Sequence, residues 1–462
     1  MALSGSTVWE VRTAGSDTNG GGFVTGASGT DFSQQDSKNS GATNKSVADV
    51  VATGVATITS ATAAFTSAIV GNIVYLSGTG ITTGWYQVVT YTNGTTVILD
   101  RSPGTGTGGT INIGGALLTI SQLCTNLSVG GMIAYIKAGT YSTSSGFTLS
   151  SNASVTFIGY STTRGDNGQP TLTTSHNSTV LFTQSSSSSN AYYNLAFSVT
   201  ATTAYACFQQ SASASLLFVN CSFTSSGTAN GGEGIYSTAQ YNPLVLVNCV
   251  FTACEYGIYG NGTYSAYFMY NCLFYGNTYG LDNAATGGTV YAEGSIFYSN
   301  QYGIYQAGTS QTFGVNHCAF VSNTSDGIYL GNIVQMNLFL NSIFYANSGY
   351  GFNQAASSYN DYYLNNAFGS NNGGGTGLNY VGTLNNSYGQ ITLTADPFVS
   401  KSTYNFALNS TGGGGAACQS AGFPGVLQKG GTGYADVGAL RHQDPSSYVG
   451  GSAAGMSSIF AM

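Results

Sequence analysis

Seven carboxylates in the middle of the chain are the residues that could do acid–base chemistry. Hydrolysis of a glycosidic bond uses two carboxyl groups within about 10 Å, one of which donates a proton. The acids are dispersed through the sequence, and no two are neighbours: Glu233, Glu255, Asp282, Glu293, Asp326, Asp361 and Asp396. Whether a pair forms therefore depends on the elements that carry these residues.

Three histidines and eight cysteines could serve as metal ligands or nucleophiles. His176, His317 and His442 are isolated in the sequence. Because His317 directly precedes Cys318, a strand would point the two side chains to opposite faces, and we expect His317 at the surface. The cysteines form no CxxC pair. We therefore predict buried free thiols, no metal site and no cofactor; the cysteines are Cys124, Cys207, Cys221, Cys249, Cys254, Cys272, Cys318 and Cys418.

A repeat organises the chain from residue 223 onward, with one step of 28 residues followed by steps of 23 or 24. Its first column is phenylalanine, at Phe223, Phe251, Phe274, Phe297, Phe320, Phe344 and Phe368. Three residues after the last five stands an asparagine, at Asn277, Asn300, Asn323, Asn347 and Asn371. A glycine followed by an apolar residue, such as Gly257-Ile258, also recurs in each unit. A period of this length indicates a repeat architecture in which each unit stacks on the next.

Short alternating segments such as VNCVF and YGIYG predict strands within each unit and no helical stripe. Three strands with turns close one coil, and stacked coils pair in parallel about 4.8 Å apart. Phenylalanine rings are then expected to stack in the interior, and asparagine side chains to bond one another along the axis. The sequence therefore predicts an all-β parallel β-helix. A leucine-rich solenoid has a similar period but needs a leucine-rich consensus, which this stretch lacks.

The repeat also places acids and tyrosines in columns. Glu233 and Asp326 share a column, but four steps of about 4.8 Å put them about 19 Å apart. We therefore expect solvated surface acids and no catalytic residue. Two tyrosine columns should point outward, one at Tyr236, Tyr259, Tyr305 and Tyr329 and the other at Tyr256, Tyr279 and Tyr302. Such a stripe suits packing against itself, an interface between subunits, or a sugar-binding groove.

Composition limits the classes of function. Only 5% of the residues are charged and 42% are hydrophobic, so the chain is expected to be folded. No Lys or Arg occurs between residues 165 and 400. That stretch cannot neutralise phosphates, so we expect no nucleic-acid binding. No apolar run reaches the length of a membrane span, so we expect no membrane insertion.

Changes of pattern divide the chain into four parts. Residues 1–115 are predicted to be a small N-terminal β module, with an Asn-Gly hairpin signal at 92–95. Residues 116–385 are predicted to be the parallel β-helix. Residues 386–444 lose the period and should form a C-terminal cap, because an open solenoid end exposes unpaired strand edges. Residues 445–462 are expected to be a flexible tail.

Three stretches resemble the right-handed parallel β-helix superfamily with the pectate-lyase-like fold. VRTAGSDTNGGGF is similar to its opening strand and turn, Ile133–Leu172 to its first coils, and Asp396–Leu440 to its terminal segment. The resemblance implies a right-handed coil, and the repeat gives about 23–24 residues per turn. It implies little about function, because the fold hosts lyases, hydrolases, adhesins and phage spikes. Lyases of this kind use an Arg or Lys base, which the stretch without Lys and Arg does not supply.

The segment 50–113, together with the join GGTINIGGAL at 108–117, resembles modules of bacteriophage virion proteins. The N-terminus has no basic region followed by an apolar one, so we expect no signal peptide. We therefore expect a structural virion protein (a capsid decoration, head fibre or tail spike) made in the host cytoplasm and located in the virion. Its partners would be other virion proteins through residues 1–115, further copies of itself as a trimer, and host glycans. We do not expect an enzyme; the alternatives are a glycan-binding adhesin and a polysaccharide lyase or hydrolase.

Overall fold

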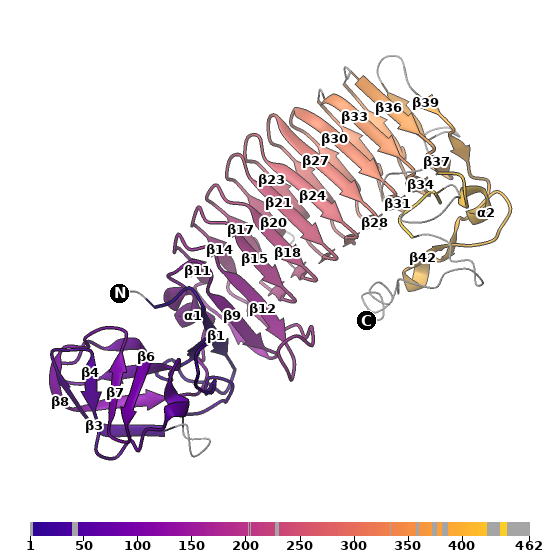
Figure 1. Ribbon diagram of the computed structural model, residues 1–462. Helices are drawn as coiled ribbons and strands as arrows, with labels where there is room; N and C mark the ends of the chain where they lie inside the picture. The colour runs from indigo at the N-terminus through magenta and orange to yellow at the C-terminus, as the bar shows by residue number, and fades with distance from the viewer. Residues whose placement is uncertain are drawn as a thin grey trace. The chain divides into compact units, whose positions relative to one another are not determined.

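The computed structural model describes residues 3–38, 45–201, 203, 205–226, 231–332, 334–356, 360–371, 377–380, 387–422 and 435–440. The chain is all-β with about 4% helix. The predicted parallel β-helix, with a small N-terminal β module and a C-terminal cap, is confirmed as a solenoid of about 10 turns (Figure 1). The expected tail at 445–462 lies outside the described residues. The chain divides into two compact units, Met1–Thr174 with Leu181–Ala196, and Ser175–Val180 with Phe197–Met462.

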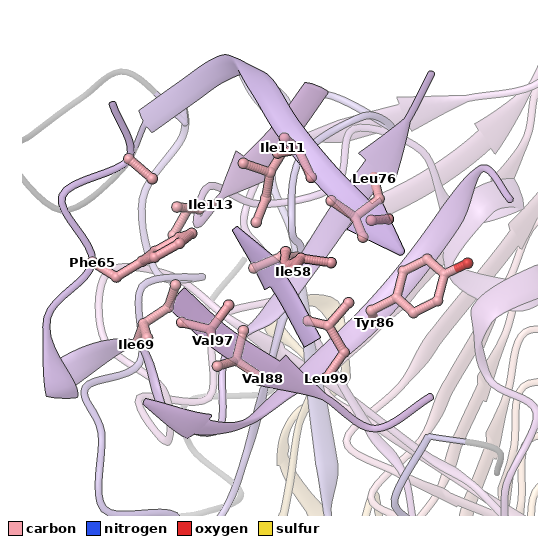
Figure 2. Close-up of a cluster of buried hydrophobic side chains, with 14 of the residues drawn as sticks. Ile58, Phe65, Ile69, Leu76, Tyr86, Val88, Val97, Leu99, Ile111 and Ile113 are labelled. Atoms are coloured by element: carbon pink, nitrogen blue, oxygen red, sulfur yellow. The ribbon is translucent and has the colours of Figure 1, made fainter. Parts of the chain in front are cut away.

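A closed antiparallel barrel forms the β module of the first unit, with strand order β3-β4-β7-β6-β5-β8. The Asn-Gly turn joins β6 to β7, and Asn93 pairs with Thr96 beside it. Alternating apolar residues such as Ile58, Val97 and Ile111 fill the interior (Figure 2). The elements are β3 (Lys45–Thr53), β4 (Thr57–Thr59), η1 (Ser67–Ile69), β5 (Ile73–Ser77), β6 (Gly84–Asn93), β7 (Thr96–Leu99) and β8 (Thr105–Ile113).

The same unit contains the first coils of the solenoid. Strand β1 pairs in parallel with β9, and β2 pairs antiparallel with β1. The predicted module of residues 1–115 therefore contains a solenoid strand as well as the barrel. The elements are β1 (Thr7–Val11), β2 (Gly22–Val24), α1 (Ile120–Asn126), β9 (Ile133–Lys137), β10 (Thr140–Ser142), β11 (Phe147–Leu149), β12 (Thr156–Tyr160), β13 (Thr171–Thr174), β14 (Phe182–Gln184) and β15 (Asn190–Tyr193).

A buried ion network holds the start of this solenoid together. Glu10 on β1 is fully buried and accepts hydrogen bonds from Arg12 Nε at 2.8 Å and Arg164 Nη2 at 2.7 Å. The hydroxyl of Tyr160 also donates to Glu10. Arg164 forms a second ion pair with Asp31 at 3.0 Å. Because both carboxylate oxygens of Glu10 are engaged, the network ties loops to β1 and leaves no free acid for chemistry.

The second unit contains three parallel sheets, and each coil contributes one strand to each sheet. The first sheet consists of β18 (Leu216–Val219), β21 (Pro243–Val247), β24 (Ala266–Tyr270), β27 (Gly288–Glu293), β30 (Ser310–Asn316), β33 (Val334–Leu340), β36 (Asn360–Leu364) and β39 (Ser387–Tyr388). The second sheet consists of β16 (Ala196–Val199), β19 (Ser222–Ser225), β22 (Val250–Thr252), β25 (Leu273–Tyr275), β28 (Ile296–Tyr298), β31 (Ala319–Val321), β34 (Ile343–Tyr345), β37 (Ala367–Gly369) and β40 (Ile391–Thr392). The third sheet consists of β17 (Phe208–Gln210), β20 (Glu233–Ser237), β23 (Tyr256–Gly260), β26 (Tyr279–Asn283), β29 (Tyr302–Gln306), β32 (Ile328–Leu330), β35 (Phe352–Gln354) and β38 (Leu378–Tyr380).

Two ladders run through the interior of these coils. The seven phenylalanines from Phe223 to Phe368 stack nearly parallel, with ring centroids 4.7 to 5.0 Å apart. In the asparagine column, Asn300 is typical: its Nδ2 donates to Asn323 Oδ1 at 3.2 Å and to the Phe274 carbonyl at 3.0 Å. Its Oδ1 accepts from Asn277 Nδ2 at 3.0 Å. The same bonds continue through Asn347 and Asn371.

A turn in the left-handed backbone region follows each strand of the first sheet. Asparagine fills most of these positions, because it tolerates positive φ better than other non-glycine residues. His317 occupies one of them with φ +49° and is only 7% exposed. The expectation of a surface imidazole is therefore wrong, because the turn directs the ring against Asn341, whose Nδ2 lies 3.3 Å from His317 Nε2. The other positions include Asn220, Asn248, Asn271, Asn341 and Asn365.

The C-terminal segment covers the outer face of the second sheet in the second unit. Outward residues such as Ile296 and Ile343 are buried beneath Phe398, Phe406 and Leu408. This packing removes an apolar sheet face from water, in addition to any protection of the last coil. The elements are β41 (Phe398–Ser400), η2 (Lys401–Thr403), β42 (Asn405–Leu408) and α2 (Gly415–Cys418). Within the described ranges, no helix has the length and hydrophobicity needed to cross a membrane.

Candidate functional site

The outer face of the third sheet carries both tyrosine columns. On β23 the side chain of Ile258 is fully buried inside the coil, whereas the neighbouring Tyr259 points outward and is half-buried. Strand register aligns one position of β20, β23, β26, β29 and β32, which holds Tyr236, Tyr259, Asp282, Tyr305 and Tyr329 in that order. A second position aligns Tyr256, Tyr279 and Tyr302. We call these eight residues the tyrosine face.

The rings of the tyrosine face pack both along and across the columns. Tyr256 stacks on Tyr279 with centroids 5.0 Å apart, and Tyr279 stacks on Tyr302 at 5.5 Å. Across the columns, Tyr302 meets Tyr305 edge-on at 5.1 Å. All seven rings are half-buried. The stripe thus packs against itself and still presents a broad aromatic surface to solvent.

Asp282 interrupts the longer column between Tyr259 and Tyr305. It is 8% exposed, and its Oδ1 has no hydrogen-bond partner in the part of the chain that the structure describes. Burial raises the pKa of Asp282 to about 7 from the usual value of 3.8. The carboxyl group therefore changes charge close to neutral pH.

A second buried acid lies at the edge of the same face. Glu233 is 7% exposed, and its Oε2 has no partner among the described residues. Burial raises the pKa of Glu233 to about 7, and the charge of Glu255 adds to the effect. Since Glu233 pairs with Tyr256, which follows Glu255, the two Cα atoms lie roughly 6 Å apart. Glu255 Oε2 accepts a hydrogen bond from the Gly231 amide at 3.0 Å.

The expectation of solvated surface acids is therefore wrong for three residues. Glu233, Asp282 and Asp326 are between 5% and 8% exposed. Asp326 is fully engaged, because it accepts from the Tyr350 amide at 2.7 Å and from Asn353 Nδ2 at 2.9 Å. Asp282 lies between Tyr259 and Tyr305 in its column. Strand alternation predicts the side of a strand that a residue takes but not what packs over it.

The arrangement combines aromatic surface with negative charge. Tyrosine rings offer apolar faces and hydroxyl groups, which suits the faces and hydroxyls of sugars. Residues 165–400 contain no Lys or Arg, so no lysine or arginine of this stretch can offset the negative charge. The face is thus suited to neutral or cationic groups and poorly suited to polyanions.

Sequence reasoning placed the tyrosines in columns but missed that Glu233 and Glu255 lie close together, because Glu233 aligns with Tyr256. The signal was present: both acids precede the repeated glycine, Glu233 by one residue and Glu255 by two. It also missed the cover on the second sheet. That signal was the apolar column between each small residue and its phenylalanine, at Val250, Leu273, Ile296, Ala319, Ile343 and Ala367.

The chain resembles known proteins only at a distance. The model of a family described as "Periplasmic copper-binding protein (NosD)" matches residues 218–405. Pectate lyase Pel9A is 14% identical with a TM-score of 0.51, and the match covers 71% of this chain and 92% of that one. At this identity the likeness shows the fold, the right-handed parallel β-helix, as predicted. No curated protein matches the sequence.

Two further structures align less well. A PL6 family polysaccharide lyase from Pseudopedobacter saltans is 12% identical with a TM-score of 0.26, over 58% of this chain and 87% of that one. The tailspike protein gp49 from Pseudomonas phage LKA1 is 9% identical with a TM-score of 0.18, over 71% of this chain and 65% of that one. Neither supports an argument about this chain's site.

The predicted virion location is wrong. The family that matches residues 218–405 is described as periplasmic. The virion prediction came from the resemblance of the segment 50–113 to modules of virion proteins. It also came from a composition typical of proteins outside the cytoplasm, combined with the expectation of no signal peptide. Composition of that kind suits any protein outside the cytoplasm, so it could not distinguish a virion from the periplasm or the cell surface.

The copper chemistry named by that family does not fit the residues described. Within the described ranges, no group of three or more His, Cys, Asp or Glu side chains could hold a metal ion. Cys221, Cys249 and Cys272 share an interior column, and all three side chains are buried and outside any disulfide among the described residues. Burial raises the pKa of the Cys272 thiol, whose Sγ contacts the Tyr270 carbonyl at 3.4 Å. Metal binding needs thiolates, and burial disfavours the thiolate of Cys272.

Proposed function

We propose that the protein binds polysaccharide chains along the tyrosine face, without cleaving them, in the periplasm or at the cell surface. The observation that carries the proposal is the double row of seven half-buried tyrosine rings on five successive strands. Four strand spacings of about 4.8 Å make this platform about 19 Å long. That length accommodates several sugar units side by side. The periplasmic description of the matched family supports the location.

Charge narrows the class of polysaccharide. Glu233, Glu255 and Asp282 lie on or beside the platform, and no Lys or Arg occurs between residues 165 and 400. A polyuronate such as pectate would bring like charges together, which costs binding free energy. We therefore propose a neutral or amino-substituted polysaccharide as the ligand.

Affinity electrophoresis in gels that contain a soluble polysaccharide tests this proposal. The full chain should be retarded by a neutral glucan or a chitin-type polymer and not by polygalacturonate. Replacing Tyr279 and Tyr302 by Ala should reduce the affinity by roughly 5- to 30-fold for each ring, as expected for a buried aromatic contact. The matched control is Tyr388→Ala, because Tyr388 is 66% exposed on the first sheet. The proposal would be refuted if Tyr279→Ala and Tyr302→Ala were retarded as strongly as the control Tyr388→Ala.

Polysaccharide hydrolysis is the second candidate, and one observation favours it. Glu233 and Glu255 are close neighbours, and the environment raises the pKa of Glu233. An acid held protonated near neutral pH beside a second carboxylate is the arrangement of a glycosidase. Asp282 does not belong to this pair, since register puts it roughly 14 Å from Glu233.

Release of reducing ends from the polysaccharides that bind would test the second candidate. Activity that Glu233→Gln abolishes, and that the surface variant Glu293→Gln leaves unchanged, would establish hydrolysis. Binding without release of reducing ends by the full chain would refute it and would leave the binding proposal intact.

A further inference from the structure

We propose that Asp282 and the four rings around it form a site for an ammonium group carried by a glycan. This inference rests on the proposed function and specifies one chemical group of its ligand. The site consists of Asp282, Tyr256, Tyr259, Tyr279 and Tyr305 on three neighbouring strands of the third sheet.

The geometry places the carboxyl group at the base of an aromatic enclosure. Asp282 occupies the register position between Tyr259 and Tyr305, so its side chain leaves the sheet on the same side as their rings. Tyr279 packs edge-on against Tyr305 with ring centroids 5.4 Å apart, and the ring centroids of Tyr256 and Tyr259 are 4.9 Å apart. Because aspartate is shorter than tyrosine, its carboxyl group ends below the level of these rings.

The side chain at the centre lacks the partner that a buried carboxylate needs. Asp282 is 92% buried, and its Oδ1 makes no hydrogen bond to any residue that the structure describes. Neither Lys nor Arg occurs within residues 165–400. Burial of an unpaired charge is costly, so the ionised form calls for a cation from outside the chain. Burial is the main cause of the raised pKa of all four tyrosine hydroxyls, and the charge of Asp282 contributes to each.

Aromatic rings and a carboxylate together recognise ammonium groups. The face of a tyrosine ring attracts a cation through its quadrupole, and several rings around one acid form a cage for substituted ammonium. The four rings are half-buried, and stacked, tilted and edge-on ring contacts join them. A glycan that lies on the tyrosine face would thus present its amino substituent directly above Asp282.

Calorimetric titration of the full chain at pH 8 with two matched probes tests this inference. The first probe is a glucosamine oligosaccharide with trimethylated amino groups, whose charge does not depend on pH. The second is its N-acetylated counterpart, which is neutral. We expect the cationic probe to bind at least about tenfold more tightly, as for one desolvated cation–ring contact. Asp282→Asn should abolish this preference and keep the affinity for the neutral probe, which also shows that the face remains folded.

Matched variants separate the outcomes. Glu293→Gln changes the net charge equally at a distance from the tyrosine face, and it should retain the preference. If Glu293→Gln also abolishes the preference, net charge explains it and the inference is overturned. A preference that survives in Asp282→Asn overturns it as well. If both probes bind equally and Tyr279→Ala removes this binding, the ammonium site is overturned and polysaccharide binding stands. If neither probe binds, the ammonium site and the proposed function are both overturned.

Discussion

Replacement of Asp282 by Asn should make the protein more stable at pH 8, although it removes an acid from a well-packed sheet. The reason is linkage between protonation and folding. Burial raises the pKa of Asp282 to about 7 in the folded chain, against 3.8 as its usual value. The folded state therefore holds this proton more tightly than the unfolded state does, so the free energy of unfolding falls as the pH rises from about 4 to about 7.

The magnitude follows from the two pKa values. Each pKa unit corresponds to about 1.36 kcal/mol, so the wild-type chain loses about 4 kcal/mol of stability across this range through Asp282 alone. Asparagine resembles the protonated acid in shape and stays neutral. The two proteins should thus have similar free energies of unfolding at pH 4, and the variant should exceed the wild type by up to about 4 kcal/mol at pH 8. The hydroxyls that face Asp282, those of Tyr256, Tyr259, Tyr279 and Tyr305, have raised pKa values and stay neutral throughout.

Urea unfolding followed by far-ultraviolet circular dichroism at several pH values provides the assay. The quantity of interest is the difference between variant and wild type at each pH, because titration of other groups cancels in that difference. Glu233 should behave in the same way, since its pKa is raised to about 7 from 4.5. Curves for wild type and Asp282→Asn that run parallel from pH 4 to pH 8 would refute a buried, unpaired Asp282. Such a result would also remove the physical basis of the ammonium site.

Three further predictions concern the scaffold. Asn300→Ala should lower the free energy of unfolding by about 2–4 kcal/mol, because it leaves buried polar groups of Asn277 and Asn323 without partners. The control Asn261→Ala, at an exposed position, should change it by less than about 0.5 kcal/mol, and urea unfolding midpoints compare the two variants. Phe297→Ala should lower the free energy of unfolding by about 3–5 kcal/mol. The Phe297 ring is fully buried, and its centroid lies 4.7 Å from that of a neighbouring ring on either side. A loss below about 1 kcal/mol would mean that the neighbouring coils collapse into the gap. Glu10→Gln should destabilise the first unit by about 3–5 kcal/mol, because Arg12 and Arg164 lose their shared partner. The control Asp36→Asn should lower the free energy of unfolding by less than about 1 kcal/mol. Tryptophan fluorescence reports on this unit, since both tryptophans, Trp9 and Trp85, lie in it.

The repeat made the solenoid predictable from the sequence. Equivalent residues such as Phe274 and Phe297 recur at a fixed step, and each contact between coils joins like with like. A one-dimensional count along the sequence is then enough to determine which residues share a column and a face. The same count placed Tyr256 and Tyr279 next to each other, as their stacked rings are.

Three features depended on tertiary structure. The barrel closes through pairing of β3 with β8, which are distant in sequence and carry no repeat. The C-terminal segment packs on the second sheet through side chains such as Phe406, whose partner no local pattern identifies. The raised pKa values of Asp282 and Glu233 arise from burial, although both residues lie on the outer face of the sheet. Periodicity determines which side of a strand a residue takes, whereas burial and charge depend on everything that packs around it, and those contacts exist only after the chain has folded.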